Sequence, residues 1–225
     1  MGAPRKPARR VAEVPPHVLA ELERGETESL NLVEWLAVDQ RRLAEHVLPA
    51  HGLAKLLPEV HAALDGLKKQ TAMTQLVTIG GVLAKSLEPG GPRSKYGRLA
   101  RHTSDFVRCW AAEMIRGYPR WNLAERLTAV EPFAADRHFG VRELAWMVYR
   151  PHLAADLEAA VELLIPWTAS ADETLRRFAS EVTRPRGVWC NHIERLKQEP
   201  ELALPLLDPL HADASRYVQN SVANW

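Results

Sequence analysis

Cysteine is scarce in this 225-residue sequence, and Cys109 and Cys190 have no Cys-x-x-Cys or Cys/His metal spacing. A disulfide scaffold and a structural zinc site are therefore not expected. No apolar run reaches the roughly 18 residues of a membrane-spanning helix, and the N-terminus lacks the apolar core of a signal peptide. These absences predict a soluble, cytoplasmic protein without a metal.

The sequence also lacks an excess of charge of either sign, because its 29 Lys and Arg residues nearly balance its 28 Asp and Glu residues. Any binding of nucleic acid must then depend on local clusters of basic residues. No P-loop or Gly-x-Gly-x-x-Gly motif supports a nucleotide-dependent enzyme. The basic, proline-rich residues 1–16 are predicted to be a disordered tail, or alternatively a nonspecific nucleic-acid arm, before a single domain over 17–225.

Strand-like alternation is scarce, whereas helical periodicity runs through most of the chain. Segments 30–47 and 152–167 keep their apolar residues on one helical face. Prolines of the second half are expected to end one short helix or begin the next; they are Pro119, Pro132, Pro151, Pro166, Pro200 and Pro209. The pattern predicts an all-α protein of many helices joined by brief turns.

Four similar segments recur at the spacing of about 35 to 45 residues that is typical of stacked helix pairs. They are VRCWAAE at 107–113, VRELAWM at 141–147, LRRFASE at 175–181 and VQNSVAN at 218–224. Each has a small aliphatic residue for close helix packing and a basic or polar second residue, which we expect near the surface. The repeat resembles the second helix of HEAT-like units and predicts an α-solenoid whose second helices build a concave face. Most such solenoids bind proteins, so the fold alone does not predict catalysis.

One segment departs from a generic repeat. A helix that carries Arg177 and Glu181 runs into Thr-Arg-Pro-Arg, where Pro185 should stop it. Arg184 and Arg186 then lie near the helix exit, where guanidinium groups can fork onto phosphate oxygens. This arrangement favours a nucleic-acid backbone as the partner.

The run SEVTRPRGVW at 180–189 resembles the SEGTRPRLPW signature of AlkC/AlkD-type DNA alkylation repair glycosylases, closer to AlkC, and YVQNSVANW at 217–225 is similar to their YVRRSVANH repeat. Residues 31–49 are similar to the family's opening helices. The resemblance implies a monomeric, monofunctional glycosylase without a cofactor. Such an enzyme hydrolyses the N-glycosidic bond of cationic N3- or N7-alkylated bases in double-stranded DNA, which lies against the concave face.

The resemblance also suggests site residues. Glu181 matches a family active-site glutamate, and Trp189 matches an active-site tryptophan. A second family glutamate lies in a Glu-Phe-Ala-Ile-Arg-Pro-Phe motif, whose counterpart here, ELAWMVYRPH at 143–152, is three residues longer. Alignment on Glu-Leu-Ala places Glu143 at that position, and alignment on Arg-Pro places Trp146 there. These two lie one helical turn apart; the carboxylates are predicted to be catalytic and the tryptophans to contact the base or sugar.

Basic residues are predicted to bind the DNA backbone at the helix exits and after the Pro-Gly-Gly-Pro turn at 89–92. They are Arg93, Lys95, Arg98, Arg150, Arg184 and Arg186. Two alternatives stay open at this point. Glu181 has the spacing to pair with Arg177 or Arg184 along its own helix, and the chain can be a noncatalytic HEAT-like module that binds DNA or a protein.

Overall fold

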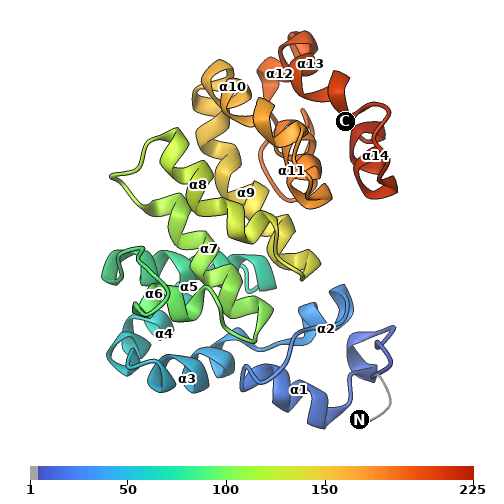
Figure 1. The fold of residues 1–225 in the computed structure, drawn as a ribbon. Coiled ribbons are helices and arrows are strands. Elements are labelled where there is room, and N and C mark those ends of the chain that lie inside the picture. The colour runs from blue at the N-terminus through green and yellow to red at the C-terminus, as the bar shows by residue number, and fades with distance from the viewer. Residues whose placement is uncertain (1–4) are drawn as a thin grey trace. The chain divides into compact units, whose positions relative to one another are not determined.

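The computed structural model describes residues 5–225, which form helices α1–α14 and η1–η4 and, over that range, no strand (Figure 1). The first four residues of the predicted tail lie outside the described part. The chain divides into two compact units, an N-terminal unit that ends at Gly117 and a C-terminal unit that begins at Tyr118. The prediction of an all-α protein is confirmed.

The N-terminal unit is a set of short helices built around one long pair. Its helices are η1 (Val11–Glu13), α1 (Pro16–Glu23), α2 (Leu32–Ala37), α3 (Gln40–Ala50), η2 (Ala54–Leu56), α4 (Leu57–Asp65), α5 (Ala72–Ser86), α6 (Lys95–Leu99) and α7 (Asp105–Gly117). α5 packs along α7 and buries Ile79, Leu83 and Trp110. Thr71 caps α5 through a reciprocal capping box with Thr74, which satisfies backbone donors at the helix start.

The described part of the N-terminal tail contacts this unit. Arg5 donates to Glu34 Oε2 at 2.8 Å and to the Glu28 carbonyl at 2.8 Å. Asn31 donates its side-chain amide to the Ala8 carbonyl at 2.7 Å. These bonds hold residues 5–8 against α2.

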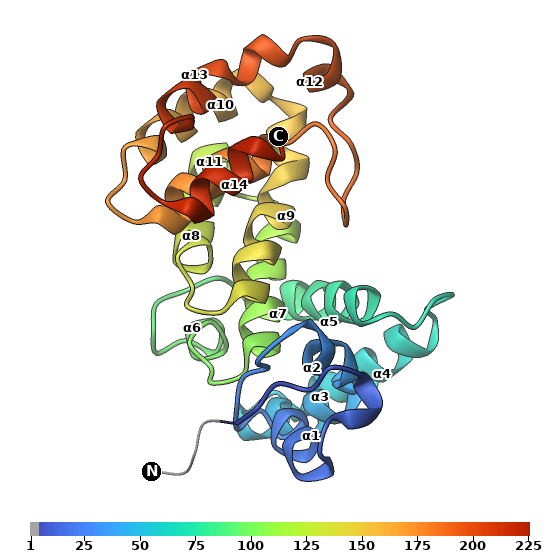
Figure 2. The same ribbon diagram turned by 90° about the vertical axis from the view of Figure 1, so that its right-hand side faces the viewer.

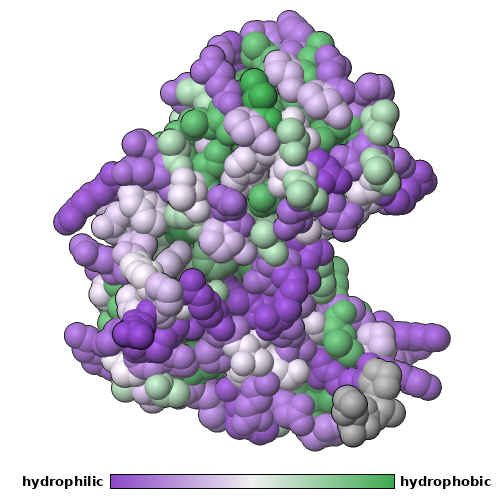
Figure 3. All heavy atoms as spheres, viewed as in Figure 1, coloured by the Kyte–Doolittle hydropathy of each residue, from purple (hydrophilic) through white to green (hydrophobic). Residues whose placement is uncertain are grey.

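The C-terminal unit consists of successive helix pairs. Its helices are α8 (Leu123–Ala134), α9 (Phe139–Ala155), α10 (Leu157–Thr168), α11 (Glu173–Thr183), α12 (Glu194–Gln198), η3 (Pro200–Ala203), α13 (Leu204–Leu207), η4 (Asp208–Leu210) and α14 (Arg216–Ala223). α8 packs on α9, α10 packs on α11, and α11 lies between α9 and α14 (Figures 1 and 2). The visible surface of each unit is largely hydrophilic, with scattered hydrophobic residues (Figure 3).

The four sequence repeats fall on α7, α9, α11 and α14. Their small residues Ala111, Ala145 and Ala179 are fully buried, as close helix packing requires, whereas Val222 is half-buried. Asp172 caps α11 by accepting from the Thr174 N–H at 2.8 Å. The predicted HEAT-like repeat architecture is confirmed.

The second residue of each repeat binds backbone carbonyls, a role that the sequence did not predict. Arg108, Arg142, Arg176 and Gln219 each reach back to the backbone carbonyl six residues earlier, at distances of 2.6 to 2.8 Å. The three arginines also bind the carbonyl five residues earlier. Arg108 is only 3% exposed. Arg142, Arg176 and Gln219 are half-buried, so the prediction of a position near the surface fails only at Arg108. All four side chains satisfy carbonyls of the turn that leads into the helix.

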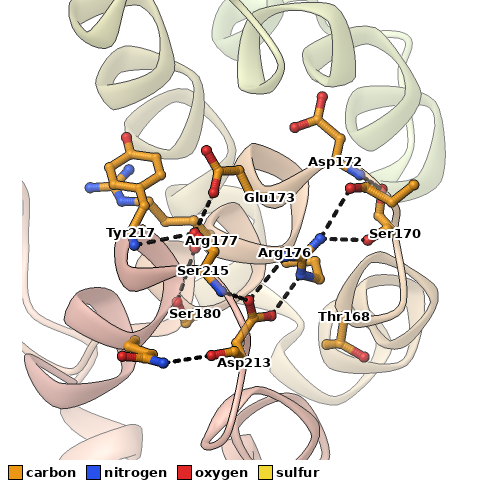
Figure 4. Close-up of polar contacts among 12 residues, drawn as sticks. Thr168, Ser170, Asp172, Glu173, Arg176, Arg177, Ser180, Asp213, Ser215 and Tyr217 are labelled. Carbon is orange, nitrogen blue, oxygen red and sulfur yellow. Dashed lines mark hydrogen bonds and ion pairs between the residues drawn. The ribbon is translucent and has the colours of Figure 1, made fainter.

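Figure 4 shows this contact at α11. Arg176 donates to the Ser170 and Ala171 carbonyls and forms a two-fold ion pair with Asp213, with N–O distances of 2.6 and 3.0 Å. Asp213 lies just before α14, where it also accepts from the Ser215 N–H at 2.8 Å. One guanidinium therefore fixes the entrance of its own helix and that of the next repeat.

The prolines separate the helices less sharply than predicted. Pro132, Pro151 and Pro166 lie inside α8, α9 and α10, and α9 continues to Ala155. Pro132 and Pro166 fall in the last turn of their helices. The N–H bond that each proline lacks, to the carbonyl four residues earlier, is therefore lost only near the helix end. Pro185 does follow the end of α11 at Thr183, as predicted.

The ion pair between Arg176 and Asp213 gives a test of this account. Arg176→Ala leaves a carboxylate with 6% side-chain exposure without its partner and frees two carbonyls, so the free energy of unfolding should fall by about 2 kcal/mol or more. The matched control is Arg195→Ala, which breaks an exposed ion pair with Glu158 and should leave stability nearly unchanged. Equal losses in chemical denaturation would contradict the proposed role of Arg176.

Candidate functional site

Two carboxylates from consecutive repeat helices share one guanidinium in the C-terminal unit. Glu143 lies in the first turns of α9, and Glu181 lies near the end of α11. Arg177, one turn before Glu181, places Nη2 at 2.7 Å from Glu143 Oε1 and 3.4 Å from Glu181 Oε1. The structure therefore brings the two predicted catalytic carboxylates to the same cation.

Arg177 is largely removed from water, with 13% side-chain exposure. The Tyr217 ring lies against Arg177 (Figure 4), with 4.5 Å between Arg177 Cζ and the ring centre. Arg142 Cζ lies 5.4 Å from the centre of the same ring. Burial acts to lower the pKa of Arg177, but the charges of Glu143 and Glu181 outweigh burial and raise that pKa. The guanidinium is thus a fixed positive charge between two carboxylates.

Glu181 is the more deeply buried of the pair, with 4% exposure. Its Oε1 accepts from the Ser221 hydroxyl at 2.9 Å, and its Oε2 accepts from Arg184 Nη1 at 3.1 Å. Together with Arg177, these donors come from α11, from the residue after it and from α14. Such a set of donors holds the carboxylate in one orientation.

Glu143 is the more accessible carboxylate, with 34% side-chain exposure. Its Oε2 accepts from Trp146 Nε1 at 2.9 Å, which places the two alternative family positions in direct contact. The Trp146 side chain itself is only 4% exposed. A side chain at Gly187, in the loop after α11, would clash with Cys190 Sγ and would lie in van der Waals contact with the Trp146 ring. Contact of Trp146 with a base or sugar would require this loop to move.

Arg150, predicted to contact the DNA backbone, is 3% exposed. Its guanidinium donates to the carbonyls of Val182 at 2.9 Å, Asn191 at 3.1 Å and Pro185 at 3.5 Å. Burial lowers its pKa. In this structure Arg150 holds the end of α11 and the loop that follows, so we infer a positioning role for it.

The loop after α11, residues 184–192, carries the remaining predicted residues of the C-terminal unit. It is closed by a bond from the Ile193 N–H to the Pro185 carbonyl at 3.0 Å. Arg186 is exposed, Trp189 is 58% exposed, and Val188 is 79% exposed. Arg184 is half-buried by its pairing with Glu181. Trp189 and Arg186 are therefore free to meet a ligand without rearrangement of the fold.

The predicted basic cluster of the N-terminal unit lies at α6. Arg93, Lys95 and Arg98 are all exposed. Lys95 donates to the Gly52 carbonyl at 3.0 Å, and Arg98 donates to the carbonyls of Arg93 at 3.0 Å and His51 at 3.4 Å. These backbone carbonyls are neutral, so the positive charges keep their field at the surface, as binding to phosphate requires.

Within residues 5–225, no three side chains of His, Cys, Asp and Glu are grouped closely enough to hold a metal ion. Over the same range, no helix combines the length and the apolar character needed to cross a membrane.

Three residues of the site were missed by reasoning from the sequence. Arg177 appeared only as a helix partner of Glu181, while its bond to Glu143 joins two repeats. Tyr217 and Ser221 contact Arg177 and Glu181 from α14. Their spacing of four residues, which puts both on one face of a helix, was the available signal.

Comparison with known proteins adds independent evidence on the fold. No family model matches the sequence. A search of curated proteins finds an uncharacterized protein, YhaZ of Bacillus subtilis, that is 38% identical over 108 residues, a match that covers 48% of this chain and 28% of YhaZ.

Among solved structures, the chain is similar to Pseudomonas fluorescens alkylpurine DNA glycosylase AlkC, bound to DNA that contains an abasic site analog. The TM-score is 0.61 and the identity is 25%, and the match covers 78% of this chain. It spans 47% of the AlkC chain, less than half of its length. The chain therefore has an AlkC-like fold of HEAT-like helical repeats, which confirms at the level of the fold the resemblance found in the sequence.

Proposed function

We propose that this chain is a DNA alkylation repair glycosylase that hydrolyses the N-glycosidic bond of cationic N3- or N7-alkylated bases in duplex DNA. One observation carries the proposal: within an AlkC-like fold, α9 and α11 bring Glu143 and Glu181 to a single buried arginine. A carboxylate pair of this kind suits a reaction that develops positive charge on a sugar.

The alkylated base is a good leaving group and needs little activation by the protein. Alkylation at N3 or N7 makes the base cationic, so the bond from C1′ to the base breaks with its electron pair going to the base, which leaves neutral. The sugar gains oxocarbenium character, and a water oxygen then bonds to C1′ and gives up a proton. Carboxylates stabilise the sugar cation and orient or deprotonate this water.

Burial suggests different roles for the two carboxylates. Glu143, with a third of its side chain exposed, is the one that can face the sugar and the water. Glu181 is enclosed by Arg177, Arg184 and Ser221. It therefore does not contact the sugar and contributes a fixed negative charge beside Glu143. The positive charge of Arg177 between them offsets the repulsion between the two carboxylates.

Trp189 and the basic residues are proposed to bind the substrate. The exposed Trp189 ring can stack on a cationic base, where cation–π attraction of about 0.5 to 2 kcal/mol favours an alkylated over a neutral purine. Arg186, and Arg184 through its remaining N–H groups, bind phosphate beside it. Arg93, Lys95 and Arg98 are proposed as a second set of backbone contacts. Trp146 keeps its proposed base contact only if the loop opens.

The burial of Glu181 also favours a second candidate, a noncatalytic HEAT-like module that binds DNA. In that case Glu181 is a structural countercharge for Arg177 and Arg184, both of which lie at helical spacing from it. The partly exposed carboxylate of Glu143 distinguishes the two candidates, because a DNA-binding surface gains nothing from a negative charge near phosphate.

Charge removal at the two carboxylates tests the catalytic proposal. Glu143→Gln keeps the shape and removes the charge, so single-turnover base release should fall by about 100-fold, with a smaller loss of melting temperature than in Glu181→Gln because Glu143 is the less buried partner of Arg177. Glu181→Gln should lower both base release and melting temperature, since Arg177 and Arg184 lose a buried partner. The control is Glu162→Gln, an exposed carboxylate on α10, which should change neither.

Affinity for DNA with an alkylated base should hold or rise in both variants, because each removes a negative charge near phosphate. Normal release by the Glu143 variant would remove this residue from the active site. Normal release per folded Glu181 variant would assign Glu181 a structural role only.

The salt dependence of binding tests the backbone contacts. Arg186→Ala should reduce the slope of log K against log salt for undamaged duplex by about one contact, because Arg186 is exposed. Arg195→Ala is the matched control, since Glu158 and Glu199 already compensate that exposed arginine. An unchanged slope for the Arg186 variant would mean that this side chain faces away from DNA.

A further inference from the structure

The helix α14 contacts the carboxylate pair through two side chains on one face. Ser221 lies 2% exposed and donates its hydroxyl to Glu181 Oε1 at 2.9 Å. Tyr217, one turn earlier, lies over the Arg177 guanidinium with 4.5 Å between the ring centre and Cζ. Neither contact is needed to form α14, because both point across to another repeat.

We infer that Ser221 and Tyr217 of α14 are positioning residues that fix the orientation of Glu181 and Arg177, and through Arg177 that of Glu143. The inference rests on the proposed glycosylase function and deepens it. It gives the last described repeat a direct part in assembling the site.

The hydroxyl network gives Ser221 a defined orientation. Ser221 Oγ lies 2.6 Å from Ser180 Oγ, and Ser180 Oγ in turn donates to the Arg177 carbonyl at 3.0 Å. Since Ser221 gives its only hydrogen to Glu181, the 2.6 Å contact needs the Ser180 hydrogen, which Ser180 shares between Ser221 Oγ and the Arg177 carbonyl. A buried hydroxyl with a carboxylate acceptor makes a charge-assisted bond that locks the carboxylate rotamer.

Tyr217 acts on the cation rather than on a carboxylate. Its ring face lies toward Arg177, while its hydroxyl accepts from Arg142 Nε at 3.3 Å. The ring replaces water on one side of the guanidinium. Arg177 then has its donors directed to Glu143 and Glu181 and cannot turn toward solvent without losing this contact.

Matched variants separate positioning from stability. Ser221→Ala should lower single-turnover release of alkylated base by about tenfold or more, the size that one hydrogen bond to a charged group can produce, at unchanged affinity for DNA. Ser180→Ala removes an equally buried hydroxyl that contacts Ser221 rather than Glu181, so it should lower release less than Ser221→Ala does. If Ser221→Ala fails to fold, Ser221→Cys keeps the side-chain volume and supplies only a weak donor.

The corresponding pair for Tyr217 is Tyr217→Leu, which removes the ring, and Tyr217→Phe, which keeps it. We expect the Leu variant to lose release by about tenfold and the Phe variant to stay close to native. Equal release in Ser221→Ala and Ser180→Ala, or equal release in the two Tyr217 variants, would overturn the inference for that residue.

A readout independent of catalysis distinguishes this inference from the proposed function. The melting temperatures of Ser221→Ala, Glu181→Gln and their double variant should be non-additive, with the double variant losing less than the two single losses combined. If the native chain releases no base, the proposed function fails, and additive losses in this cycle would show that Ser221 does not hold Glu181 either.

Discussion

The site depends on a buried guanidinium, that of Arg177, between two carboxylates. A cation removed from water is costly unless anions and hydrogen-bond acceptors surround it. Glu143 from α9 and Glu181 from α11 meet this requirement, and Tyr217 covers the open face. Because each partner comes from a different repeat helix, the same interaction sets the register of α9, α11 and α14 relative to one another.

The repeats supply the rigidity that such a cluster needs. In each repeat, the second residue binds the carbonyls of the turn before its own helix, and at α11 Arg176 also reaches Asp213 before α14. These contacts fix where each second helix begins. The position of Glu181 along α11 is then fixed opposite Ser221 on α14. A small shift of either helix would break the 2.9 Å hydrogen bond between these two side chains.

Much of the fold could be predicted from the sequence, because apolar periodicity and the four repeats are local patterns. All four copies fall on second helices, and α11 ends before Pro185 as expected. The resemblance at 180–189 also pointed to the correct fold. The prolines within α8 and α10 were not predicted, since a proline in the last turn and one after the helix give the same sequence signal. Pro151 lies further inside α9, where the sequence indicated a helix end.

The site was predictable only in part. Glu143 and Glu181 lie close together, as predicted. The role of Arg177, which pairs with both, depends on packing between repeats, and no local sequence pattern indicates that packing. Arg150 illustrates the limit: an arginine near a helix end suits either phosphate or buried carbonyls, and only the fold reveals three carbonyl partners. Trp146 and Trp189 likewise differ in burial, although their sequence signals were alike.

The most direct test of the central claim is base release by the unmodified chain. Methylated duplex DNA is incubated with the protein, and free N3-methyladenine, N3-methylcytosine and N7-methylguanine are separated and measured. The account predicts release of at least one cationic base at a rate well above the spontaneous rate, with undamaged DNA left intact. Binding to the same DNA without release of any alkylated base would contradict it and leave a noncatalytic DNA-binding module.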